Sequence, residues 1–102
     1  MIAEDKATLV INAIINKENV AELPDYLGKV MPVFIKNGGQ PLARYKISKS
    51  LVGTDSPEMV AIIEFPNADV IEEMANGKDF MALTDLRSRV FNKLNMVVCE
   101  SL

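Results

Sequence analysis

The sequence predicts an α+β domain of the ferredoxin-like kind, in which a four-stranded antiparallel sheet carries its helices on one face. The first observation is the run Met59 to Ile63, five consecutive apolar residues between the turn formers Ser56-Pro57 and Pro66-Asn67. A short apolar run of this kind, rich in β-branched residues, is typical of a strand covered on both faces, which belongs inside a sheet. The second is the order strand, helix, strand, strand, helix, strand, which gives two βαβ units with right-handed crossovers.

Three further segments have strand patterns. Residues 7–16 are β-branched and almost continuously apolar, which predicts a second central strand. Asn12 interrupts one of its faces, as Glu64 interrupts the strand around Ile62. Residues 42–52 alternate between apolar and polar, as an edge strand does, and a short loop joins them to the central run as a hairpin. Residues 96–101 form the predicted final strand.

The first predicted helix carries an apolar stripe from Val20 to Phe34, with steps of three and four residues. Pro24 fits the first turn, where amide hydrogens have no partner. Pro32 deletes the hydrogen bond to the carbonyl of Gly28, so we expect a kink or an interruption there. The sequence Asn37-Gly38-Gly39 ends this helix.

Two helical segments follow the central strand. Asn67 is the predicted N-cap of a short helix that ends at Ala75. Asp79 is the predicted N-cap of the next, whose apolar stripe runs from Phe80 to Leu94.

Composition limits the classes of function. The 102 residues suit a single domain over positions 1–102, with a net charge of −3 and no basic cluster for nucleic acid. No apolar run approaches the roughly 20 residues that span a membrane. The first residues include Glu4 and Asp5 and no apolar signal core, so we expect a cytoplasmic protein.

Histidine is absent, which removes the commonest general base and the commonest metal ligand. Hydrolases that use serine–histidine or cysteine–histidine pairs are therefore excluded, as are histidine-ligated metal sites. We expect neither a metal nor a cofactor. The single cysteine, Cys99, lies in an apolar run and is interpreted as a small buried hydrophobic residue.

Strand alternation predicts which side chains share a face of the sheet. Asn12, Arg44 and Glu64 fall together on the face without helices, amid an apolar centre, which is the composition of a ligand pocket. Arg44 and Glu64 could instead form a purely structural pair across neighbouring strands. The predicted helix-facing set is Leu9, Ile11, Ala13, Ile15, Ala43, Tyr45, Ile47, Met59, Ala61, Ile63 and Phe65, and the predicted opposite set is Val10, Asn12, Ile14, Arg44, Lys46, Ser48, Val60, Ile62 and Glu64.

Two helical residues add candidate polar groups. Arg87 lies on an apolar stripe, so its guanidinium either reaches solvent along a buried stem or anchors a carboxylate. Tyr26 lies off the main stripe of its helix and could supply a hydroxyl.

Three motifs resemble a known family: the stretch from Tyr26 to Gly39, the run Ile62 to Asn67, and the spacing from Phe80 to Arg87. They are similar to a small bacterial family, the domain of unknown function numbered thirteen-thirty, within the dimeric α/β-barrel superfamily. The chain departs from the family pattern at Gln40 to Tyr45 and at Gly77 to Phe80, where a phenol hydroxyl is lost. The resemblance implies a homodimer whose two sheets close into a barrel. It assigns no reaction, since the superfamily includes monooxygenases, isomerases and binding proteins.

These observations leave three hypotheses open. The first is a homodimer that binds a small acidic or phenolic ligand on the helix-free face, through Asn12, Tyr26, Arg44, Glu64 and Arg87. The second is a cofactor-independent oxygenase or isomerase with Glu64 as the candidate catalytic base. The third is a non-catalytic module that binds only its own copy. The dimer itself is predicted from the uncovered apolar residues Val10, Ile14, Val60, Ile62, Met96 and Val98.

Overall fold

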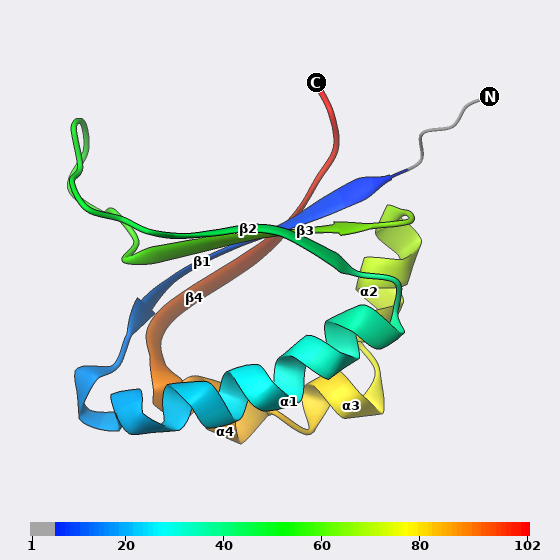
Figure 1. Ribbon diagram of the computed structural model, residues 1–102, viewed down its shortest axis with the longest axis horizontal. Helices are drawn as coiled ribbons and strands as arrows, with labels where there is room; N and C mark the ends of the chain where they lie inside the picture. The colour runs from blue at the N-terminus through cyan, green and yellow to red at the C-terminus, as the bar shows by residue number, and fades with distance from the viewer. Residues whose placement is uncertain (1–5) are drawn as a thin grey trace.

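The computed structural model describes residues 6–102 and has the predicted ferredoxin-like architecture, an antiparallel sheet with all its helices on one face (Figure 1). The elements, in chain order, are β1 (Ala7–Ile15), the 3-10 helix η1 (Lys17–Glu22), α1 (Leu23–Lys36), β2 (Gln40–Lys46), β3 (Met59–Phe65), α2 (Ala68–Ala75), α3 (Lys78–Met81), α4 (Thr84–Val90) and β4 (Phe91–Cys99).

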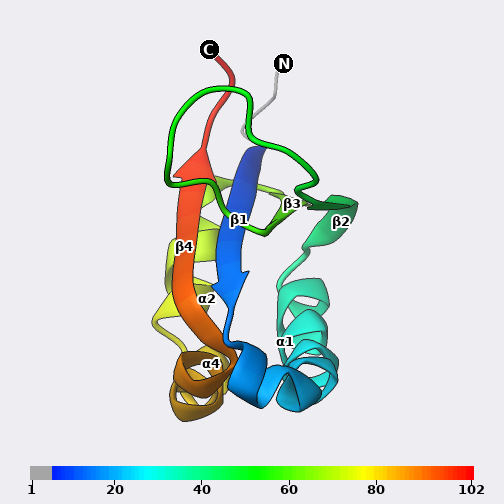
Figure 2. The same ribbon diagram turned by 90° about the vertical axis from the view of Figure 1, so that its left-hand side faces the viewer.

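The sheet has the strand order β2-β3-β1-β4, so the two predicted central strands are the central strands (Figure 2). Leu9 of β1 lies opposite Ile63 of β3, and Ile11 lies opposite Ala61. The helix-facing side chains of both strands are therefore aligned, and they form the floor on which the helices pack.

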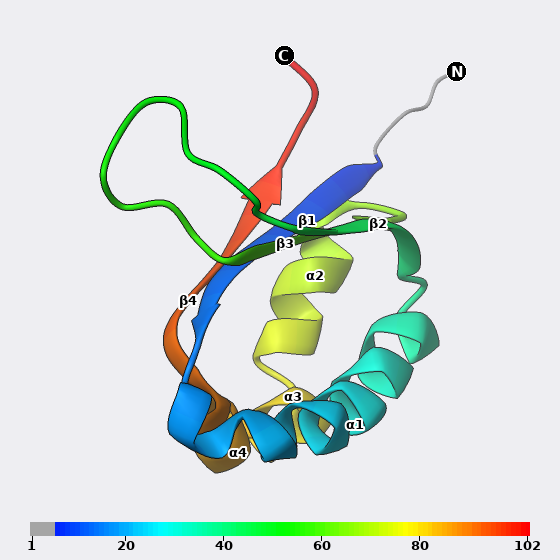
Figure 3. The ribbon, with the colours of Figure 1, turned by 60° about the vertical axis from the view of Figure 1, so that its left-hand side comes forward.

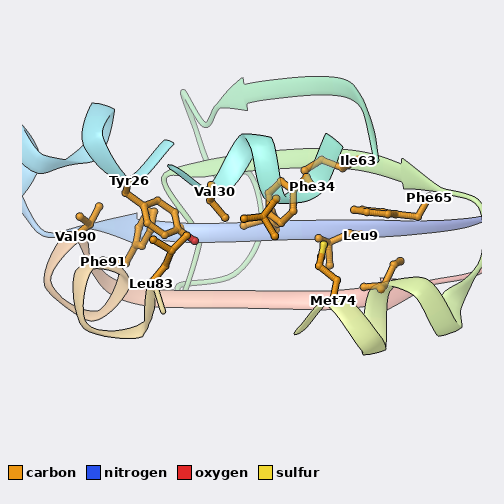
Figure 4. Close-up of a cluster of buried hydrophobic side chains, with 14 of the residues drawn as sticks. Leu9, Tyr26, Val30, Phe34, Ile63, Phe65, Met74, Leu83, Val90 and Phe91 are labelled. Atoms are coloured by element: carbon orange, nitrogen blue, oxygen red, sulfur yellow. The ribbon is translucent and has the colours of Figure 1, made fainter. Parts of the chain in front are cut away.

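The core fills the space between this floor and the helices (Figure 4). Phe34 and Phe65 meet edge to face with ring centroids 6.3 Å apart, and Tyr26 and Phe91 do so at 5.5 Å. Aromatic pairs favour this geometry, because the edge of one ring is positive and the face of the other negative. Val30 and Val90 are also fully buried, with Val30 between Tyr26 and Phe34 and Val90 beyond Tyr26 (Figure 4).

Helix α1 continues without a break through Pro32, so the predicted interruption is wrong. Pro24 occupies the first turn, as predicted. Pro32 and Gly28 both face solvent. The carbonyl of Gly28, which Pro32 leaves without an intrahelical partner, can therefore bond to water. The helix tolerates a proline on its solvent-facing side for this reason.

The end of the chain differs from the prediction. Asn67 is the N-cap of α2, accepting from the Val70 amide at 2.9 Å, as predicted. Asp79 is not a cap; it pairs with Lys36 of α1 at 2.9 Å, and Gly77 precedes α3. Strand β4 begins at Phe91, so the residues interpreted as the last helical turns belong to a strand.

Strand β2 differs in both extent and register. It ends at Lys46, and the predicted strand residues beyond it belong to a long loop, 47–58, on the side of the sheet away from the helices (Figure 3). A register shift lies between Pro41 and Ala43, after which Arg44 is opposite Ala61 and Tyr45 is opposite Val60. A bulge adds one residue to a strand of period two, so every later side chain changes face.

The bulge corrects part of the predicted face assignment. Arg44 and Lys46 point to the helix side, and Ala43 and Tyr45 take the register positions of the helix-free side. In β4, Met96 lies opposite Ile11 and is also on the helix side, as is Val98; Val97 and Cys99 share the helix-free face instead.

Candidate functional site

A cavity of about 370 Å³ lies between α1 and the sheet, and we call it the inner cavity. Val30 and Phe34 point from α1 toward the sheet beside it (Figure 4). Ala61 contributes only a methyl group to the sheet at this point, which leaves space under the helix. The residues that line the inner cavity are Ile11, Tyr26, Leu27, Val30, Met31, Phe34, Pro41, Leu42, Ala43, Arg44, Met59, Ala61, Ile63, Phe91, Leu94 and Met96.

Two polar side chains line this otherwise apolar cavity. Arg44 comes from β2 and is exposed, so its guanidinium stands where the cavity meets solvent. The second is Tyr26 of α1, which is only 4% exposed. An apolar space with a few polar groups is the usual composition of a small-molecule site, and arginine is suited to carboxylates.

Tyr26 is next to Arg87 of α4. Burial raises the pKa of the Tyr26 phenol, while the charge and hydrogen bonding of Arg87 act against that rise. The phenol is therefore neutral at physiological pH. It can serve as a hydrogen-bonding group but not as a phenolate base.

Two contacts with Phe80 hold the guanidinium of Arg87 in place. It donates to the carbonyl oxygen of Phe80 at 3.1 Å through Nη2, and it stacks on the Phe80 ring at 4.1 Å from the centroid. The ring of Tyr26 is 5.9 Å away. Arg87 thus supports Tyr26 from behind the cavity; it does not itself line the cavity wall.

The structure places Glu64 and Asn12 on the opposite face of the sheet. The Glu64 carboxylate is 3.5 Å from Nζ of Lys6, and its side chain is 30% exposed. Asn12 accepts a hydrogen bond from Asn95 Nδ2 at 3.2 Å. The predicted pairing of Arg44 with Glu64 is therefore wrong, because the β2 bulge puts the two side chains on different faces.

The five predicted site residues consequently form two groups. Tyr26, Arg44 and Arg87 surround or support the inner cavity, while Asn12 and Glu64 belong to the helix-free face. On that face the hollow beside Asn12 has only about 30 Å³, so a ligand pocket there would need a second copy to enclose it.

One feature of the sequence is consistent with the inner cavity, the small residue Ala61 in the middle of β3. Ala61 is a small residue in a strand of larger ones, and its register partner on one side is Ile11 and on the other Arg44. A small residue in mid-strand can indicate a space, but only when the element that packs above it is known.

Within residues 6–102, no group of three or more Cys, Asp or Glu side chains is placed to bind a metal ion.

Comparisons with known proteins agree with the fold. The sequence matches the domain of unknown function DUF1330 over residues 7–102. None of the curated proteins matches it. Within the part of the chain that the structure describes, no helix has the length and hydropathy that crossing a bilayer requires.

Several solved structures resemble this one at low sequence identity. A protein of unknown function from Rhodopseudomonas palustris aligns with a TM-score of 0.81 and 15% identity, covering 98% of this chain and 85% of that one. A dimeric protein of unknown function with a ferredoxin-like fold, from Bacteroides fragilis, aligns with a TM-score of 0.67 and 10% identity. The alignment covers 96% of this chain and 98% of that one. SnoaB, a cofactor-independent oxygenase from Streptomyces nogalater, aligns with a TM-score of 0.69 and 12% identity. The alignment covers 96% of this chain and 94% of that one. At these identities the likeness establishes the fold alone.

Proposed function

Because the chain belongs to the DUF1330 family, whose description names no reaction, we propose a function from the site itself: a homodimeric binding protein for a small organic acid with an apolar body. The observation that carries the proposal is the inner cavity, an apolar space of about 370 Å³ with Arg44 at its edge. The apolar body of the ligand occupies the cavity under α1, and its carboxylate pairs with the guanidinium. The site proposed here is therefore on the helix side of the sheet, whereas the sequence predicted a pocket on the helix-free face.

Decanoate tests this proposal by isothermal titration calorimetry at pH 7, with decanol as the uncharged probe of the same length. We expect one decanoate to bind each chain. Arg44→Gln should weaken decanoate binding about tenfold or more, because a charge-assisted hydrogen bond is lost, and leave decanol binding unchanged.

Two variants place the ligand on one side of the sheet. Ala61→Leu should weaken both probes at least tenfold, since the added carbons fill the inner cavity. Glu64→Gln, on the opposite face, should leave both affinities within twofold. The proposal would be contradicted if neither decanoate nor decanol bound to the unmodified protein. If Glu64→Gln weakened decanoate binding as much as Arg44→Gln does, the ligand would lie on the helix-free face instead.

The homodimer is the second part of the proposal. The helix-free face carries partly exposed Val10, Ile14, Val60 and Ile62, together with Val97, which is 47% exposed. A contiguous apolar face of this kind is seldom left in water, and a second copy can cover it by two-fold symmetry. The Bacteroides fragilis protein, which shares the fold, is described as dimeric, and this supports dimerisation.

A cofactor-independent oxygenase is the alternative function, favoured by the Tyr26 hydroxyl in the inner cavity and by the shared fold of SnoaB. Such an enzyme would consume dioxygen in the presence of an activated phenol such as a hydroquinone. Oxygen uptake above the uncatalysed rate, lowered by Tyr26→Phe, would establish it. Uptake at the uncatalysed rate would leave the binding protein as the function.

A further inference from the structure

A second, more open hollow of about 720 Å³ adjoins the inner cavity, and we call it the outer hollow. Leu27, Arg44 and Met59 line both spaces, so the two are neighbours with these three side chains at their common border. The outer hollow is lined by residues of η1, the first turns of α1, the end of β2 and the start of β3, and in Figure 1 η1 and the end of β2 lie at the same end of the molecule. Its other lining residues are Ile15, Lys17, Val20, Leu23, Tyr45, Lys46, Ile47 and Glu58.

The outer hollow is positively charged in a chain whose net charge is −3. Arg44, Lys46 and Lys17 line it, and none of them has an ion-pair partner within residues 6–102. Arg44 and Lys46 share the helix side of β2 because the bulge before them reverses the face, and Lys17 approaches from η1. Three cations from two elements are thus concentrated around one hollow.

One carboxylate lies among them, and it is already engaged. Oε1 of Glu58 accepts a hydrogen bond from the Ile15 amide at 2.9 Å, which fixes it against β1. It offsets one positive charge at most, so the hollow keeps a net positive charge. Like charges held together without partners repel each other, and a bound anion relieves that repulsion.

We propose that the ligand of the inner cavity carries a head group with at least two negative charges, a phosphate monoester or a dicarboxylate, which occupies the outer hollow between Arg44, Lys46 and Lys17. This inference rests on the proposed binding function and adds the chemical class of the ligand's head. The apolar body lies under α1, and Arg44, which borders both spaces, contacts the junction between body and head.

Calorimetry at pH 8 with decanoate, decyl phosphate and decylmalonate tests the head group, since a phosphate monoester has a second pKa near 6 and is a dianion there. We expect decyl phosphate to bind about tenfold more tightly than decanoate. Tighter binding of decylmalonate as well would show that charge suffices, and tighter binding of decyl phosphate alone would identify phosphate; both outcomes support the proposal.

Charge-removing variants locate the head. Lys46→Gln and Lys17→Gln should each reduce the preference for decyl phosphate over decanoate about two- to fivefold, the upper range for an ion pair of exposed side chains. Lys78→Gln removes the same charge from α3, which lines neither space, and should leave the preference unchanged.

The outcomes separate this inference from the proposed function. Equal binding of decanoate, decyl phosphate and decylmalonate overturns the dianionic head and leaves the acid-binding cavity intact, whereas tighter binding of decylmalonate alone would identify a dicarboxylate head and support the proposal. A preference that Lys46→Gln and Lys17→Gln do not alter overturns the placement in the outer hollow. Absence of binding by all three probes overturns the proposed function together with this inference.

Discussion

Tyr26 is a phenol enclosed by the core, and its ionisation is coupled to folding. Burial raises the pKa above the ordinary value of 10.0, although the neighbouring Arg87 opposes the rise. As pH increases past about 10, the unfolded chain loses this proton before the folded chain does. The free energy of unfolding therefore falls with rising pH in that window, and below it Tyr26 contributes no pH dependence.

We expect the unmodified protein to lose more stability between pH 9 and pH 11 than Tyr26→Phe loses, with a difference of at most about 1.4 kcal/mol per pH unit. Urea unfolding of both proteins at several pH values measures it. Other groups titrate equally in both, so only the difference between the two curves reports Tyr26. Parallel curves would contradict the inference that the folded protein retains the Tyr26 proton.

At the scale of single elements, α1 contains a matched test of its proline. Pro32→Ala restores an amide that can bond to the carbonyl of Gly28 on the solvent side. We expect the free energy of unfolding to rise by about 1–3 kcal/mol, less than the full helix-interior cost of proline, because the unfolded chain also gains freedom. Pro24→Ala, in the first turn, should change it by less than about 0.5 kcal/mol. Equal effects of both changes would contradict this account of α1.

The connection from α1 to β2 depends on close backbone approach at Gly39. A Cβ there would be 2.7 Å from the Phe34 carbonyl oxygen and 2.8 Å from Cζ of Phe65, and the preceding Gly38 has φ of +87°. Gly39→Ala should therefore lower the free energy of unfolding by about 1–3 kcal/mol. Gly28→Ala is the control, since its Cβ would meet nothing within 4 Å, and it should raise stability by about 1 kcal/mol. If urea unfolding showed that the free energy of unfolding changes in the same direction for Gly39→Ala and Gly28→Ala, this explanation would be refuted.

At the scale of the whole molecule, the helix-free face predicts association. Ile62 lies in central β3 on that face, opposite Val10 of β1. Sedimentation equilibrium at micromolar concentration should give the unmodified protein a mass of two chains. Ile62→Asp should give monomer or aggregate, because a carboxylate would be buried without a partner at the interface. A mass near one chain for the unmodified protein would contradict the dimer.

Local pattern determined much of the architecture. The apolar run around Ile62 and the run 7–16 identified the central strands, because one face of each strand packs in the core under the helices and the other face is also mostly apolar. Asn67 identified a helix start, because its side chain bonds to an amide only three residues away. The succession of elements indicated the ferredoxin-like topology with its helices on one face of the sheet, since crossover connections are right-handed.

Only the tertiary structure decided the composition of the site. The bulge at Leu42 places Arg44 on the helix side, and one extra residue in a strand reverses every later position without altering the alternation that the sequence displays. Phe91 fits a helical stripe and a strand equally well, so packing against Tyr26 and pairing with β1 decide its state. The inner cavity exists because α1 crosses above Ala61, and a space between two elements depends on their separation, which no local pattern encodes.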